Sequence, residues 1–450
     1  MGKTLIINIA MPIWIGGDTN SHIYSIYHLE REYKKAKYNS NFDIYIFQVK
    51  FQLINNQEHY VLIKLKYEQN LENINEGKFV SQEITNPILD IGSAEGIKAL
   101  LKEVDYLNEG YTKRILGTFS HGFGYSIFSQ EITSDDELFE FIEDEKHYEI
   151  IESSKNFEKH QIVGEYKFDK GRAYQAYLLP QKPTVLTMKE LAMGLKIATV
   201  KEENKTLDAI IFANCFMQTA DTVYALKDYC KYIIGAETIF SWEAYDFKLL
   251  VDDEIENDYE KYLKNFLKGS FEFIREGLDQ TKTVSNEQIA LSLIRTKDVD
   301  SFFLALHNII IFFIEHIEND VELFDDFKNT LSYCYDVTGE FENGIVDIMQ
   351  FFNNFQKSAK NNYPVLDNNL NLIKTLLVDS VFRAIFPGKN FKQPFPEVIG
   401  MSINLPANPA IEDIGSYYRT FSDTDSRFQS DFSKDNHWGT FLKILENMYL

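Results

Sequence analysis

Short apolar runs alternate with helix-like stretches through the first half of this 450-residue chain. Residues 3–10, 115–119 and 208–214 are rich in aliphatic side chains, and each run predicts a buried β-strand. Residues 21–37 and 94–107 predict helices, the second from apolar side chains at helical spacing. A strand–helix–strand order favours a mostly parallel sheet covered by helices on both faces. The predicted fold class of this half is therefore α/β.

Two local patterns add detail to this half. The β-rich residues 43–53 and 60–66 flank the polar residues 55–58, which predicts a hairpin. Thr187 and Glu190 have the spacing of a capping box, in which each side chain bonds the other residue's backbone N–H. A helix is therefore predicted to begin directly after Thr187.

A long insertion, at about residues 126–185, separates the second and third of these strands. It contains the acidic run 134–145 and two β-like runs at 161–168 and 173–179. Because charge runs usually mark solvated segments, we interpret the insertion as a surface excursion rather than a regulatory flap.

The second half of the chain is predicted to contain more helix, and its predicted helices are rich in Phe and Leu. They cover residues 261–274, 300–317 and 320–341. A β segment at 398–405 follows near the end. The predicted organisation is an α/β domain over residues 1–255, which includes the insertion, and a helix-rich C-terminal region over 256–450 that ends in this β-containing segment.

Charge limits the partners of the chain. Its net charge of −23 comes from 68 acidic and 45 basic residues. Nucleic acid and anionic membrane surfaces attract clustered Lys and Arg, so neither is expected as a partner. The most apolar stretch, residues 302–317, is shorter than the ~20 residues of a membrane span and predicts a buried helix.

The cysteine count bears on compartment. Three cysteines do not suit a disulfide framework and favour a reducing compartment, so a cytoplasmic location is expected. The start of the chain faintly resembles a signal peptide, but Asn8 and Pro12 interrupt its apolar run. We interpret that run as the first core strand.

Two predicted strands end in reactive side chains, His121 and Cys215. Active sites commonly lie beyond the carboxyl ends of parallel strands, and a thiol with an imidazole can form a nucleophile with its proton acceptor. Gly122 has no Cβ and would let the backbone approach a substrate. A helix expected to begin at Cys215 would favour the thiolate through its positive end.

Each residue also has a simpler interpretation. A lone His at a strand end is usually a hydrogen-bonded structural residue, and a buried Cys usually packs as a small hydrophobe. Cys230, expected in an amphipathic helix, and Cys334, expected in a helix-rich stretch, both look like packing residues. Neither His121 nor Cys215 is diagnostic by itself.

An ordered set of motifs resembles the clostripain family of cysteine peptidases, which belongs with caspases, gingipains, legumain and separase. The first is the pair His121-Gly122 at a strand end. The others are residues 186–191, 207–217, 224–229, 233–237 and 400–406. The resemblance spans nearly the whole chain apart from the insertion.

The resemblance implies a caspase–hemoglobinase α/β core with Cys215 as nucleophile and His121 as general acid/base. The backbone N–H groups of Gly122 and Cys215 would form the oxyanion hole. Some relatives depend on calcium, but the acidic residues 252–256 lack a calcium-loop spacing, so no metal or cofactor is expected. Trp242 lies where the family has an aromatic residue beside the substrate.

The chain departs from the family two residues before the nucleophile. Relatives that cleave after Arg or Lys carry Asp there, whereas this chain has Ala213, followed by Asn214. An alanine cannot pair with a basic side chain, so no strong preference for Arg or Lys is expected. Glu237 is one acidic residue nearby that could restore such a preference. Ala213, Asn214, Glu237 and Trp242 are thus the candidate substrate-binding residues.

The predicted function is that of a cysteine endopeptidase acting on protein or peptide substrates. One or few intracellular targets, an intact single chain and control by a regulatory partner are further expectations. Two alternatives stay open: a pseudoprotease that binds without turnover, and a legumain-like transpeptidase.

Overall fold

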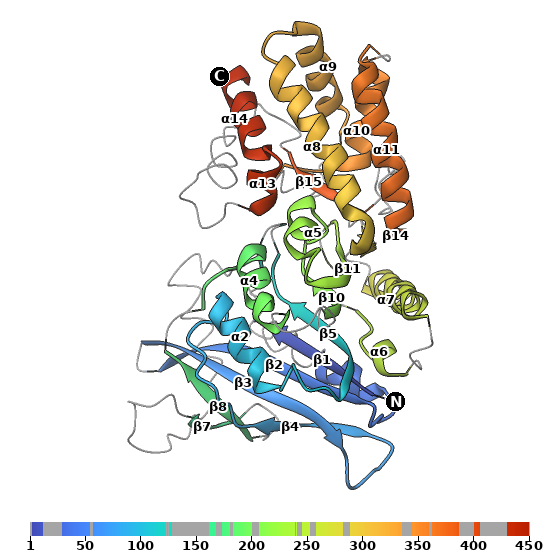
Figure 1. Ribbon diagram of the computed structural model, residues 1–450. Coiled ribbons are helices and arrows are strands. Elements are labelled where there is room, and N and C mark those ends of the chain that lie inside the picture. Colours follow the sequence, from blue (N-terminus) through green and yellow to red (C-terminus); the bar gives the residue numbers. More distant parts are fainter. Residues whose placement is uncertain are drawn as a thin grey trace. The chain divides into compact units, whose positions relative to one another are not determined.

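The computed structural model describes most of the chain (Figure 1). The described residues are 2–11, 29–54, 57–122, 124, 126–127, 162–167, 173–180, 183–199, 207–238, 240, 245–252, 258–281, 289–334, 344–359, 362–386, 400–405 and 430–449. The chain divides into two compact units. Unit 1 comprises Met1–Gly122, Ser126–Ala213 and Glu243–Ser270, and unit 2 comprises Phe123–Tyr125, Asn214–Trp242 and Phe271–Leu450. These two units do not coincide with the domains predicted on either side of residue 255. That domain boundary stays a prediction.

Unit 1 is built on a sheet with the strand order β10-β5-β1-β2-β3-β8-β7, with β4 beside β3. The strands are β1 (Lys3–Ala10), β2 (Phe42–Ile54), β3 (Gln57–Gln69), β4 (Gly77–Gln82), β5 (Tyr111–Phe119), β7 (Ile162–Lys167), β8 (Ala173–Leu179) and β10 (Leu207–Ala213). The four strands from β10 to β2 are parallel, and the strands beyond β2 are antiparallel. The predicted α/β class and the first core strand are confirmed.

The parallel strands β1 and β10 are mostly apolar, as is usual where helices cover both faces of a sheet. All seven residues of β10 are buried, as are seven of the eight residues of β1. Asn8, a buried polar side chain inside β1, donates a hydrogen bond from Nδ2 to Tyr33 Oη at 3.2 Å. Its polarity is therefore satisfied within the core.

The hairpin and part of the insertion are visible in this sheet. Strands β2 and β3 pair antiparallel up to Ile54 and Gln57, so the predicted hairpin is confirmed with a shorter tip. Strand β8 pairs with β3, and β7 pairs with β8. These two strands of the insertion extend the main sheet, so the surface interpretation is wrong for them. The acidic run 134–145 lies outside the described residues.

The helices of unit 1 begin where the sequence indicated. Helix α2 (Ala94–Glu103) is capped by the side chain of Ser93. Helix α4 (Met188–Thr199) follows the capping box, in which Glu190 N donates to Thr187 Oγ1 at 3.2 Å and Thr187 N donates to Glu190 Oε2 at 3.0 Å. Two further short elements are β6 (Ser126–Ile127), paired with β9 (Leu186–Thr187), and α6 (Leu249–Asp252). Residues 29–35 are the described part of the helix predicted over 21–37.

Unit 2 combines antiparallel strands with helices (Figure 1). Its strands are β11 (Cys230–Ala236), β12 (Ile289–Arg295) and β14 (Val381–Phe386), plus the pair β13 (Ile345–Asp347) and β15 (Ser402–Asn404). Its helices are α5 (Ala220–Leu226), α8 (Val299–His316), α9 (Val321–Ser332), α10 (Ile348–Ala359), α11 (Pro364–Ser380), α13 (Asp431–Asp435) and α14 (Trp438–Tyr449). Helix α7 (Tyr259–Thr281) runs from unit 1 into unit 2. The helix-rich C-terminal region and its late β segment are confirmed.

Aromatic side chains form the core of the helical part. The Phe313 ring of α8 lies 5.3 to 5.5 Å, between centroids, from Phe327 of α9, Phe355 of α10 and Phe441 of α14. Among the described helices, α8 is long and apolar enough to cross a membrane by length and composition. Eight of its residues are buried within unit 2, which fits the predicted core helix.

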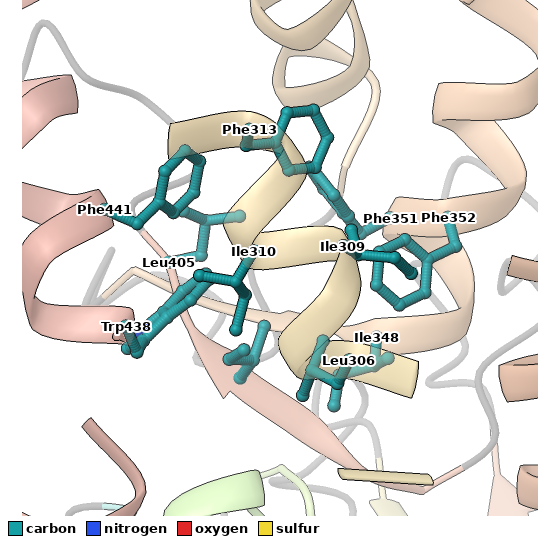
Figure 2. A pocket seen from close by; sticks show the side chains of 11 residues that line it. Leu306, Ile309, Ile310, Phe313, Ile348, Phe351, Phe352, Leu405, Trp438 and Phe441 are labelled. Atoms are coloured by element: carbon teal, nitrogen blue, oxygen red, sulfur yellow. The ribbon is translucent and has the colours of Figure 1, made fainter. Parts of the chain in front are cut away.

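A cavity of about 20 Å³ lies within this core. Figure 2 shows side chains from α8, α10 and α14 around it, with Ile310, Phe351 and Trp438 among them. Every residue that lines it is apolar. A water needs two to four polar partners, so a cavity of this kind stays dry.

Candidate active site

The His121 end of the site follows β5 in unit 1. The strand ends at Phe119, Ser120 is buried, and His121 is half-buried. Ser120 Oγ donates a hydrogen bond to the carbonyl oxygen of His121 at 2.9 Å. Gly122 then forms an antiparallel bridge with Ile127 of β6. The backbone on both sides of His121 is therefore held in place.

The Cys215 end follows β10. Asn214 is buried and the half-buried Cys215 lies in a turn. The helix expected to begin at Cys215 begins instead at Ala220, with Thr219 as its cap. Phe216 has a positive φ of 58°, a left-handed conformation that cannot continue into a helix. The predicted helix-dipole stabilisation of the Cys215 thiolate is therefore wrong.

The pairing register of β5 and β10 shows how the ends of these two strands align within unit 1. Strands β10 and β5 are parallel neighbours, and Ala213 pairs with Phe119. His121 lies two residues after Phe119, and Cys215 lies two residues after Ala213. The two reactive residues therefore follow the same edge of the sheet on adjacent strands.

The Cys215 loop, residues 214–219, is bonded to the end of β11 and to the residues after it. Gln218 N donates to Ala236 O at 3.0 Å, and Phe216 N donates to Thr238 O at 3.1 Å. These bonds use N–H groups that an α-helix would have directed along its own axis. They help to explain why the helix begins only at Ala220.

A glycine after His121 is tied to the same loop. The carbonyl oxygen of Gly124 accepts hydrogen bonds from Thr219 Oγ1 and from Thr222 Oγ1, the second at 3.2 Å. Gly124 has φ of 80°, and a Cβ there would lie 3.0 Å from Thr219 Cγ2 and 3.3 Å from the carbonyl oxygen of Phe216. Only glycine meets both conditions without strain. Sequence reasoning missed the two threonines, since their spacing carries no catalytic signal.

A buried carboxyl lies in the first turn of α5. Asp221, in α5, accepts hydrogen bonds from Asn404 Nδ2 at 3.1 Å and from Ser430 Oγ. Burial raises the pKa of Asp221 from 3.8 to about 6. Asn404 belongs to β15, and Ser430 caps α13, so this carboxyl joins α5 to the C-terminal segments. Sequence reasoning missed it too, because its partners Asn404 and Ser430 lie about 180 and 210 residues later in the chain.

Three of the four candidate substrate-binding residues lie in the described part of the chain, and all three are buried. Ala213 and Asn214 are 2% and 1% exposed. Glu237 is fully buried, and burial, followed by the nearby charge of Asp347, raises the pKa of its carboxyl well above the usual value. Burial thus favours the neutral form of this carboxyl and keeps it out of reach of solvent. Trp242 lies outside the described residues.

The remaining cysteines behave as packing residues. Cys230 opens β11, so the amphipathic helix expected around it is wrong. Its thiol is buried, and burial raises its pKa. Burial raises the pKa of Cys334, at the end of α9, to about 12. Within the part of the chain that the structure describes, no cluster of His, Cys, Asp and Glu could hold a metal ion.

Comparison with known proteins identifies the family. The model of the clostripain family matches residues 176–445, more than half of the chain. The chain therefore belongs to the clostripain family and is a cysteine-type peptidase, whose substrates are proteins or peptides. Comparison with curated protein sequences finds no match.

Several solved structures have a similar fold. A secreted C11 cysteine protease from Bacteroides thetaiotaomicron is 14% identical with a TM-score of 0.54, covering 90% of this chain and 94% of that one. A secreted C11 cysteine protease from Bacteroides thetaiotaomicron in complex with an irreversible peptide inhibitor is 12% identical with a TM-score of 0.54, covering 98% of this chain and 100% of that one. An inactive zymogen C11 protease from Parabacteroides distasonis is 16% identical with a TM-score of 0.54, covering 96% and 97%.

These relatives correct the expected location. Two of the similar structures are of secreted proteases, which contradicts the cytoplasmic location predicted from the cysteine count. The physical reason is that a low cysteine count indicates only that disulfides are not needed for stability, which a core of this size makes possible in any compartment. The expectation of few intracellular targets depended on a cytoplasmic location and is therefore no longer supported.

Proposed function

We propose that this peptidase hydrolyses peptide bonds with Cys215 as nucleophile and His121 as general acid/base. The observation that carries the proposal is the register of β5 and β10, in which both residues lie two positions beyond the Phe119–Ala213 pair. The bonds from Thr219 and Thr222 to Gly124 support it, because they tie the chain after His121 to the chain after Cys215.

The chemistry follows from the two side chains. The imidazole of His121 takes the thiol proton, and the thiolate sulfur attacks the carbonyl carbon of the substrate. The backbone N–H groups of Gly122 and Cys215 are proposed to stabilise the resulting oxyanion. The imidazolium then protonates the departing amine, and water hydrolyses the acyl-enzyme with His121 as the base.

We further propose that the peptidase does not strongly prefer Arg or Lys before the cut. A carboxylate attracts a basic side chain through charge-assisted hydrogen bonds, and Ala213 offers only a methyl group. Glu237 does not replace it, since its carboxyl is fully buried and burial raises its pKa. Ala213→Asp should therefore raise cleavage after Arg and Lys in a peptide library, and a parent enzyme that already cleaves there would sink this proposal.

The dyad is tested by comparing single-residue variants on one peptide library. Cys215→Ala and His121→Ala should each lose nearly all hydrolysis, whereas Cys334→Ala, which removes a thiol elsewhere, should keep it. Thermal unfolding of each variant checks that the fold is intact. Hydrolysis that survives in Cys215→Ala would show that another residue is the nucleophile.

We also propose that the active form is an intact single chain. Self-cleavage after a basic residue would need the preference that Ala213 removes. Mass spectrometry of purified active protein should give the full-length mass, and two stable fragments would contradict this.

A further inference from the structure

The end of β11 and the residues after it contact the Cys215 loop. The carbonyl of Ala236, the last residue of β11, accepts from Gln218 N at 3.0 Å, and the carbonyl of Thr238 accepts from Phe216 N at 3.1 Å. Phe240, two residues after Thr238, makes a third contact, with the Cys215 side chain.

At this third position the direction of the bond reverses. The backbone N–H of Phe240 donates a hydrogen bond to Cys215 Sγ with an N···S distance of 3.2 Å. The acceptor is thus the reacting atom of the proposed nucleophile. A donor aimed at sulfur favours the thiolate over the thiol, because hydrogen bonds to ionised acceptors are about twice as strong as neutral ones.

Hydrogen bonds to Ala290 of β12 hold Thr238, two residues before this donor, in place. Its Oγ1 accepts from Ala290 N at 3.1 Å, while Glu237 N donates to Ala290 O at 2.9 Å. The side chain of Thr238 is 2% exposed, so water does not compete for its hydroxyl. Strand β12, which contains Ala290, therefore fixes the segment two residues before Phe240.

We propose that the backbone N–H of Phe240 is a catalytic donor to the Cys215 thiolate and that Thr238 is its positioning residue. The proposal rests on the proposed role of Cys215 as nucleophile. When the S–H bond breaks, the proton goes to the His121 imidazole and the electron pair stays on sulfur, where the N–H bond stabilises it. As the S–C bond to the substrate forms, that charge moves to the carbonyl oxygen and the N–H···S bond weakens.

A donor of this kind has two opposing effects on reactivity. It increases the fraction of sulfur that is ionised at low pH, and it makes each thiolate less nucleophilic, since nucleophilicity falls with basicity by a Brønsted factor of about 0.4–0.5. Loss of one hydrogen bond to a charged group shifts the ionisation midpoint upward by about one pH unit. Without the donor, the thiolate fraction at low pH falls about tenfold while each thiolate reacts about threefold faster.

The test is the pH profile of Cys215 alkylation by iodoacetamide in the full chain, read by mass spectrometry of the Cys215 peptide. Phe240→Pro removes the N–H group, and Phe240→Ala is the matched control that loses the ring but keeps the donor. Relative to Phe240→Ala, the proline variant should react about threefold more slowly at low pH and about threefold faster at high pH, so the profiles cross. Cys334 in the same digest is the internal reference.

A second pair of variants covers the case in which the proline variant fails to fold. Thr238→Val removes the hydroxyl at nearly constant volume, and Thr238→Ser keeps it. The valine profile should shift in the same direction by a smaller amount, and the serine profile should match the parent. Hydrogen exchange at the Phe240 amide should also be faster in Cys215→Ala than in the parent.

Three results would overturn the proposal: identical profiles for the proline and alanine variants, a uniform loss of reactivity at every pH, or unchanged amide exchange in Cys215→Ala. The failure of the proposed function looks different. If Cys215 is not the nucleophile, Cys215→Ala keeps its peptidase activity, whereas failure of the donor proposal leaves Cys215→Ala inactive.

Discussion

Replacing Asp221 by Asn removes a carboxyl that the fold buries completely. The carboxyl accepts hydrogen bonds from Asn404 and Ser430, and burial raises its pKa from 3.8 to about 6. The amide of asparagine has nearly the same size and still carries one oxygen acceptor. The substitution therefore removes the charge while it keeps most of the packing.

The sign of the effect follows from the raised pKa. The stability contributed by Asp221 is fully present below its unfolded pKa near 3.8 and is lost as pH rises through about 6, because the folded state binds the proton more tightly. A shift of about two pKa units corresponds to about 3 kcal/mol over the whole range. The parent should thus lose stability relative to Asp221→Asn as pH rises.

The assay is urea unfolding of both proteins at several pH values above the sequence isoelectric point, about 4.9. The fluorescence of Trp438 reports on this region, since its Nε1 donates to the carbonyl oxygen of Asn404 at 3.0 Å. The free energy of unfolding of the variant minus that of the parent should be about 1 kcal/mol larger at about pH 7.5 than at about pH 5.2.

A matched control separates burial from charge. The side chain of Asp228, just after α5, is 72% exposed, so Asp228→Asn should show no such pH-dependent difference. A constant difference between Asp221→Asn and the parent over the whole pH range would refute the reasoning. It would show that burial does not perturb this carboxyl.

Three further substitutions test parts of the fold. Gly124→Ala should lower the free energy of unfolding by about 1–3 kcal/mol and reduce peptidase activity, because alanine is strained at φ of 80°. Glu190→Ala should lower it by about 1 kcal/mol through the lost capping box, with unchanged kcat/KM. Phe441→Ala should lower it by about 3–5 kcal/mol, since its ring is buried against Phe313. Urea midpoints and a peptide assay measure all three, and values near the parent would contradict the packing described.

The elements that could be predicted from sequence are those with a strong local signal. The last part of the strand that precedes His121, residues 115–119, is a buried and mostly apolar run, and Thr187 with Glu190 has the spacing of a capping box. Such signals depend on a few neighbouring residues, so tertiary contacts do not overrule them. The positions of His121 and Cys215 after their strands were predictable for the same reason.

The rest depends on contacts distant in sequence. Phe216 adopts its left-handed conformation because its N–H bonds Thr238, 22 residues later, and no local pattern near Cys215 reports this. Cys230 opens a strand because β11 pairs with β12, although the preceding residues favour a helix. Long-range pairing commonly overrides local preference in β-strands.

The central claim is that Cys215, activated by His121, is the nucleophile. Its most direct test is mass spectrometric mapping of the covalent adduct formed with an irreversible, thiol-directed peptide inhibitor. One adduct per chain is expected, on Cys215 and not on Cys230 or Cys334, and it should form much more slowly in His121→Ala. An adduct on either other cysteine in place of Cys215, or labelling of Cys215 at the parent rate in His121→Ala, would contradict it.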